Sequence, residues 1–171
     1  MLARVRQVAV IAAVLFLAGF ASPDAEFSRR VGRYISLHRK AAKQSSRIRT
    51  TGASAVIVSP RVALARQIRT LRAGARQGDI FTPEAEKEFR RLVDLAMNAP
   101  EGARPRAGPA EAELILNNEP PPAAPPPPSL LLQLPRLPEE LDYRIAGRAL
   151  VLRDTIANVV VDFIPDLLPA N

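Results

Sequence analysis

Apolar side chains recur every three or four residues in three stretches of the chain, and the same two kinds of residue precede each stretch. The pairs are Ser22-Pro23, Ser59-Pro60 and Thr82-Pro83. A hydroxyl side chain can cap the first turn of a helix, and proline is tolerated there because its missing N–H would be unpaired anyway. The pattern therefore predicts helices over residues 24–45, 60–77 and 83–98.

One face of each predicted helix is apolar and is expected to be buried. The faces comprise Phe27, Val31, Tyr34, Ile35, His38 and Ala42 in the first helix, Leu64, Ile68, Leu71 and Ala75 in the second, and Ala85, Phe89, Leu92, Val93 and Ala96 in the third. Gly78 follows the second stretch. Glycine adopts the left-handed conformation of a helix end at the least cost, so we expect the second helix to end there.

From residue 141 the period changes to that of a strand. Residues 141–145 alternate, Gly147-Arg148 is typical of a two-residue turn, and residues 149–153 form the returning strand. The pairs expected across this turn are Ile145 with Leu150, Tyr143 with Leu152, and Asp142 with Arg153 as an ion pair. This segment is therefore predicted to be an antiparallel hairpin.

A second turn near residues 155–157 leads to a third predicted strand over 158–163. In the simplest register, Val159 lies beside Leu152 and Val161 beside Leu150. Asp162 then points away from the apolar face. Because all three strands would present apolar side chains to one side, we expect a three-stranded meander packed on the helices.

The region between the helices and the strands is rich in proline. Residues 99–109 are typical of a loop, and a short helix is predicted over 110–117. Residues 119–128 should form extended polyproline, either a stiff spacer, which we favour, or a docking site for a proline-recognising module. The prediction is an α+β protein with a basic helical region at 22–118, a proline-rich linker at 119–138 and a β-meander at 139–171.

Residues 1–21 have the pattern of a secretory signal peptide. Arg4 and Arg6 precede an uncharged apolar run from Val8 to Phe20, and small residues before Ser22 place the cleavage site after Ala21. The alternative is an uncleaved anchor, but a spanning helix needs about 20 apolar residues and this run is shorter. We therefore expect a periplasmic or secreted protein with no transmembrane anchor after cleavage.

Charge is distributed unevenly along the chain, whose net charge is +7. Residues 27–76 contain thirteen Lys or Arg and no Asp or Glu, whereas residues 77–171 contain nine basic and fifteen acidic residues. The basic half predicts either an anionic envelope partner or internal neutralisation by the acidic half. Nucleic acid is not an expected partner, because the protein is predicted to be exported and the basic half has few aromatic side chains for base stacking.

The candidate contact for an anionic partner consists of basic residues on the first two predicted helices. They are Arg29, Arg30, Arg33, Arg39, Lys40 and Lys43 in the first, and Arg61, Arg69, Arg72 and Arg76 in the second. Glu84, Glu86 and Glu88 are the expected partners of the second group if the charges are neutralised internally. Both alternatives remain open at this point.

Few residues offer catalytic chemistry. The chain contains no cysteine and a single histidine, His38, so we expect no metal, no cofactor and no assembled catalytic site. The favoured function is a non-catalytic binding or structural module of the envelope. The alternative is a periplasmic hydrolase that uses Asp154 or Asp162. A third possibility is assembly through an exposed edge of the strand at 158–163.

Two sequence motifs resemble a family of small exported bacterial proteins with no assigned function. They are RQGDIFTP at residues 76–83, and LDYRIAGRALVLRD at 141–154 followed by ANVVVDFIP at 157–165. The resemblance implies a signal peptide, a helical N-terminal part and a strand-rich C-terminus. It implies no catalytic residue.

Overall fold

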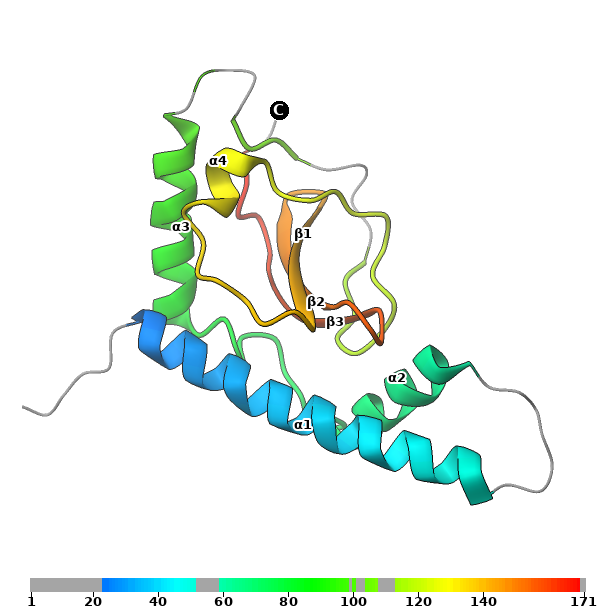
Figure 1. Ribbon diagram of the computed structural model, residues 1–171. Helices are drawn as coiled ribbons and strands as arrows, with labels where there is room; N and C mark the ends of the chain where they lie inside the picture. Colours follow the sequence, from blue (N-terminus) through cyan, green and yellow to red (C-terminus); the bar gives the residue numbers. More distant parts are fainter. Residues whose placement is uncertain (1–22, 52–58, 99, 101–103, 108–112, 170–171) are drawn as a thin grey trace, which may run out of the picture.

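The computed structural model describes residues 23–51, 59–98, 100, 104–107 and 113–169 (Figure 1). Its elements are α1 (Pro23–Thr51), α2 (Pro60–Leu71), α3 (Pro83–Met97), α4 (Pro128–Leu131), β1 (Leu141–Ala146), β2 (Ala149–Asp154) and β3 (Val159–Ile164). Helices followed by a three-stranded antiparallel sheet confirm the predicted α+β layout. The predicted signal peptide lies outside the described residues.

Each of the three long helices begins at the proline that the sequence indicated. The Ser59 hydroxyl accepts a hydrogen bond from the Val62 N–H, and the Thr82 hydroxyl accepts one from Ala85, each at 3.3 Å. The capping prediction is therefore confirmed for α2 and α3.

The helix ends differ from prediction at three places. α1 continues to Thr51 rather than ending near Ser45, and α2 ends at Leu71 rather than at residue 77. Residues 113–117, part of the predicted short helix, are not helical. Arg72 directly follows the last helical residue of α2, and its side chain bonds acceptors in the interior. Gly78 lies in the following loop at φ +86°, a conformation that glycine tolerates, and does not cap the helix.

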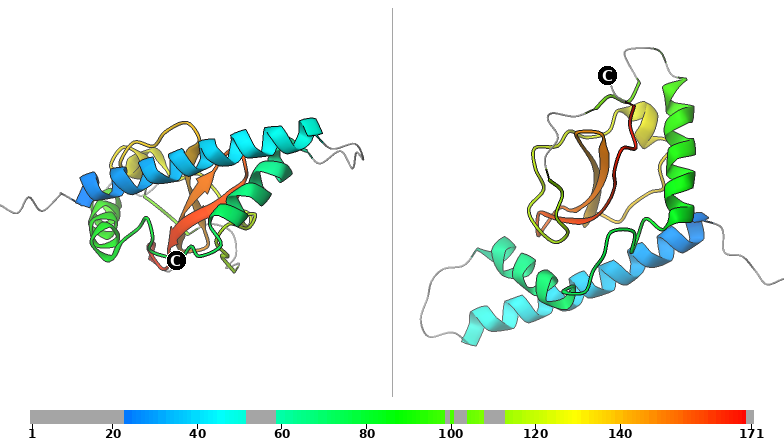
Figure 2. Two further views of the ribbon diagram at one scale, coloured as in Figure 1. Left: turned by 90° about the horizontal axis from the view of Figure 1, so that it is seen from below. Right: turned by 180° about the vertical axis from the view of Figure 1, so that it is seen from behind.

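The sheet lies in the angle between α1 and α3, with α2 beside the C-terminal half of α1 (Figures 1 and 2). Four aromatic rings join these elements at the centre of the core: Phe27 from α1, Phe81 from the loop before α3, Phe89 from α3 and Tyr143 from β1. Their centroids lie 5.0 to 6.0 Å apart in successive contacts. These separations are typical of favourable ring packing.

The hairpin of β1 and β2 has the predicted register. Asp142 lies opposite Arg153, Tyr143 opposite Leu152, and Ile145 opposite Leu150. The Arg153 guanidinium approaches the Asp142 carboxylate to 2.6 Å, which confirms the expected ion pair.

The predicted register between β2 and β3 is wrong. The turn spans residues 155–158, so Asp154 pairs with Val159, two residues away from the predicted register. A bulge then inserts one extra residue in β3, so Leu152 pairs with Asp162 and Leu150 with Ile164. The shift turns Asp162 toward the core, where its exposed fraction is 0%. A period-two pattern cannot reveal a bulge, because the inserted residue changes the face of every residue beyond it.

Both edges of the sheet are covered. Val160 in β3 exchanges backbone hydrogen bonds with Asn117 and Asn118, and Ile145 in β1 exchanges two with Ala124. The proline-rich stretch is therefore a cover for β1, continuing into α4, whose Leu130 is fully buried. The expected open edge at 158–163 is blocked at Val160, which leaves little support for assembly through it.

Asp162 fixes the loop between α2 and α3 to the sheet. Its carboxylate accepts hydrogen bonds from the backbone N–H groups of Gly78, Ile80 and Phe81 at 2.8 to 3.0 Å, and from its neighbour Phe163 at 2.9 Å. The motif RQGDIFTP thus has a structural explanation, because this loop presents its backbone donors to one buried carboxylate.

Replacing Asp162 by Asn should lower the free energy of unfolding by at least about 2 kcal/mol, because an amide puts N–H donors against N–H donors. Urea unfolding monitored by circular dichroism measures the effect. The matched control is Asp166→Asn, since Asp166 is exposed and makes a surface ion pair with Arg148. Its cost should stay below about 1 kcal/mol. Equal costs for the two variants would contradict the anchoring role of Asp162.

Candidate functional site

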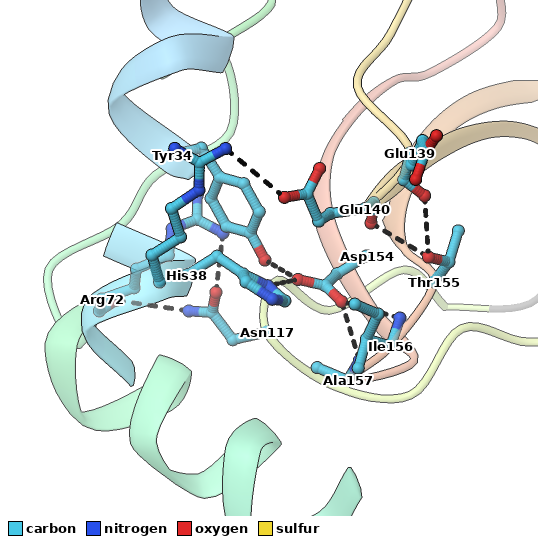
Figure 3. A network of polar contacts seen from close by, with 11 residues as sticks. Tyr34, His38, Arg72, Asn117, Glu139, Glu140, Asp154, Thr155, Ile156 and Ala157 are labelled. Carbon is cyan, nitrogen blue, oxygen red and sulfur yellow. Dashed lines mark hydrogen bonds and ion pairs between the residues drawn. The ribbon is translucent and has the colours of Figure 1, made fainter. Parts of the chain in front are cut away.

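A buried polar network joins α1 to the end of β2 (Figure 3). Asp154 is 0% exposed, and its Oδ2 accepts a hydrogen bond from the Tyr34 hydroxyl at 2.7 Å and lies 2.6 Å from His38 Nδ1. Its Oδ1 accepts the backbone N–H groups of Ile156 and Ala157 at 3.0 and 2.7 Å. Tyr34 and His38 reach the same oxygen because residues four apart lie on one helix face.

The network shifts the pKa values of its members. Burial alone would raise the pKa of Asp154, but the hydrogen bonds from His38, Ala157 and Tyr34 outweigh it and hold that pKa below its usual value. The hydrogen bond to Asp154 raises the pKa of His38 against the opposing effect of burial. Burial and the Asp154 charge raise the pKa of Tyr34, which therefore stays a neutral donor.

The contacts of this network join α1 to the sheet. The two oxygens of Asp154 already have four donors, and the Thr155 hydroxyl donates to the backbone carbonyls of Glu139 and Glu140. A histidine–aspartate pair activates a nucleophile only if one lies within reach of the imidazole. Three surface cavities formed by described residues are lined without Asp154 and Asp162.

Arg72 is buried and belongs to the core. Only 8% of the residue is exposed, and its guanidinium donates to Asn117 Oδ1 at 2.8 Å and to the Val161 carbonyl at 2.9 Å. The same guanidinium lies 5.2 Å from the centre of the Tyr34 ring. Asn117 returns a hydrogen bond from Nδ2 to the Arg72 carbonyl. Arg72 is thus part of the fold, whereas the sequence placed it in an exposed contact.

Two further α2 arginines contact residues 117–119. Arg69 donates from Nε to the Asn117 carbonyl at 3.0 Å, and Arg61 lies 3.8 Å from Glu119. The expected pairing with the glutamates of α3 is not found, because Glu86 pairs with Arg90 and Glu88 with Arg91. Glu84 lies at the start of α3, where backbone and Thr82 hydrogen bonds lower its pKa.

The basic residues of α1 fall into two groups. Arg29 and Arg30 both pair with Glu26, and Arg30 also donates to the Asp79 carbonyl. By contrast, Arg33, Lys40 and Lys43 are exposed, and the described residues provide none of them with an ion pair or hydrogen bond. On a helix these three share one side, which we call the α1 basic face.

Arg76 and Arg39 are the remaining basic residues that the sequence suggested for an anionic contact. Arg76 is exposed, and Arg39 lies 3.8 Å from Glu140 near the buried network. Within the described ranges, no group of three or more His, Cys, Asp or Glu side chains is placed to hold a metal ion. The described helices include none with the length and apolar character needed to cross a bilayer.

Comparisons with protein-family models, curated proteins and solved structures found no match to this chain. The resemblance to small exported proteins therefore stays a prediction.

The buried network predicts a pH-dependent stability. Because the pKa of His38 is raised, its contribution is fully present below pH 6.5 and is lost as pH rises through the folded-state value. The free energy of unfolding should fall between neutral and alkaline pH by up to about 1.4 kcal/mol per pH unit. His38→Gln should remove this slope, and urea unfolding across that range measures it. Identical slopes in both proteins would contradict the assignment of this pH dependence to His38. No other histidine contributes to the slope, because the chain has only one.

The structural role of Arg72 is tested separately. Arg72→Gln should lower the free energy of unfolding by about 2 kcal/mol or more, because Asn117 and the Val161 carbonyl lose a buried donor. Arg66→Gln, on the exposed side of the same helix, should change it by less than about 0.5 kcal/mol. Thermal or urea unfolding measures both values. Equal free energies of unfolding for the two variants would contradict the buried structural role of Arg72 and support its place in the exposed contact.

Proposed function

We propose that the protein is exported and acts outside the cytoplasm as a non-catalytic module that binds an anionic component of the envelope. The observation that carries this proposal is the α1 basic face. Arg33, Lys40 and Lys43 are exposed without an acidic partner among the described residues. Uncompensated cations on one face attract anionic surfaces and raise the rate of encounter with them.

Contacts within the protein engage part of the basic half and not this face. Arg61 and Arg69 of α2 contact the segment around Asn117 and Glu119, and two of the α3 glutamates pair within their own helix. The described acidic residues therefore leave the α1 basic face free to meet an external anion.

The spacing of the cations on the α1 basic face suits a contact with the surface of a membrane or polymer, without insertion. Arg33 and Lys40 are seven residues apart, so they lie two helical turns or about 10 Å apart on nearly the same line. Among the α1 side chains that the structure describes, the exposed ones beside them include Gly32 and Ser36 and no large apolar residue. A helix that inserts into a bilayer needs an apolar face beside its cations, so electrostatic attraction to headgroups or to a charged polymer is favoured.

The hydrolase alternative has weaker support. Asp154 and Asp162 are both fully buried, and each carboxylate already accepts four hydrogen bonds when the His38 contact is included. A general acid or base must reach the proton that it transfers. Neither carboxylate has such a position.

The test is co-sedimentation of the chain from Ser22 onward, which contains every described element, with phosphatidylglycerol and phosphatidylcholine vesicles. Binding to the anionic vesicles alone, weakening as salt shortens the screening length, is expected. Each cation near an anionic lipid surface contributes about 1 kcal/mol. The triple variant R33Q/K40Q/K43Q should therefore bind roughly 100-fold more weakly.

The matched control is K87Q/R106Q/R136Q, which removes the same charge from exposed residues elsewhere. If both triple variants lose affinity equally, net charge and not the α1 basic face is responsible. A soluble polyanion in place of vesicles tests the polymer form of the partner. Failure of the intact chain to bind either one at low salt would overturn the proposal.

A further inference from the structure

A small groove lies where α1, the end of α2 and the loop before α3 meet. Its volume is about 180 Å³, and its polar walls are Arg30 and Arg33 from α1, Arg72 after α2, and Asp79 from the loop. The Tyr34 ring forms part of the wall, and Leu37 and Ile80 supply apolar surface. Pockets for drug-sized ligands occupy about 300–1,000 Å³, so this groove suits a single small group.

The charge of the groove is positive. Three arginines and one aspartate line it. The carboxylate of Asp79 is turned to its own loop, where Oδ2 accepts the Arg76 N–H at 2.8 Å. The hydrogen bonds of Arg72 go to neutral acceptors, the Asn117 amide and the Val161 carbonyl. Burial lowers the pKa of Arg72 although the charges of Asp162 and Asp79 act against this, so a further anion in the groove stabilises its charged form.

Two of the arginines that line the groove keep N–H donors without an acceptor among the described residues. A guanidinium has five N–H donors. Arg72 uses one on each of its two terminal nitrogens, and Arg33 makes no hydrogen bond or ion pair with any described residue. Arg30 is held by Glu26 and the Asp79 carbonyl, which fixes its position at the rim.

We propose that this groove binds a phosphate group, with Arg33 as the principal ligand and Arg30 and Arg72 as flanking ones. Guanidinium forks that arrive from separate elements suit a tetrahedral phosphate, whereas a flat carboxylate is satisfied by one fork. Leu37 and Ile80 fit the carbon side of a phosphate ester. The assignment rests on the proposed function, because Arg33 also belongs to the α1 basic face, and the phosphate is then that of the anionic partner.

The phosphate can come from a lipid headgroup or from a soluble ester, so both are probes. Glycerol 3-phosphate, acetate and phosphatidylglycerol vesicles are titrated against the chain from Ser22 onward, with ¹⁵N NMR of the arginine Nε–H groups as the readout. Glycerol 3-phosphate should shift the Arg33 and Arg72 signals and bind at least tenfold more tightly than acetate. R33Q should weaken that binding at least tenfold. K87Q, on α3, should leave it unchanged.

Arg33→Lys separates charge from geometry. It should restore vesicle binding close to the original, because the charge is kept, but not the binding of glycerol 3-phosphate, because the planar fork is lost. The groove assignment is overturned if glycerol 3-phosphate does not bind or binds equally to R33Q, even where vesicle binding persists. If glycerol 3-phosphate binds through Arg33 and vesicles do not bind, the groove stands and the proposed membrane partner fails.

Discussion

Two buried carboxylates hold this fold together. Asp154 and Asp162 stand on strands β2 and β3, and each draws a separate part of the helical region onto the sheet. A charged carboxylate in the interior is tolerable only when its oxygens are fully hydrogen-bonded. The donors are therefore as necessary as the acids. Asp154 requires two side chains one turn apart on α1, and Asp162 requires the backbone of the loop before α3.

The same constraint explains how the basic half of the chain is divided. Arginines that can reach the sheet are used in the fold, as Arg72 is with Val161 and Arg69 with Asn117. In this way α2 holds the segment that covers the edge of β3. Cations on the opposite side of α1 have no such acceptors among the described residues, so they remain available to an external partner.

The functional proposal follows from this division. Arg33 lies where the α1 basic face meets the groove beside Arg72, so an extended electrostatic contact and a specific small site share one residue. Electrostatic attraction brings an anionic surface near, while the groove could distinguish phosphate from other anions. Long-range electrostatic attraction depends little on the shape of the anion. A bidentate guanidinium contact requires acceptor oxygens at the right positions.

Local rules were sufficient for much of the architecture. The Ser/Thr-Pro pairs located the starts of the three long helices, and the Gly147-Arg148 turn set the β1–β2 register with its Asp142–Arg153 pair. These features depend on residues close in sequence, where capping and turn geometry dominate. The apolar face of α1 was also predictable, including His38, although nothing in the sequence named its partner.

Tertiary structure decided the features that depend on distant residues. The bulge in β3 turned Asp162 inward, and Asn117 and Val161 provided the interior acceptors for Arg72 at the end of α2. It also separated the arginines used in the fold from those left exposed, which look alike in a helical pattern. Sequence determined this protein's elements because caps, turns and periodicity act over a few residues. Only the folded chain could decide its buried charges, because a carboxylate or guanidinium enters the interior where partners from other elements meet it.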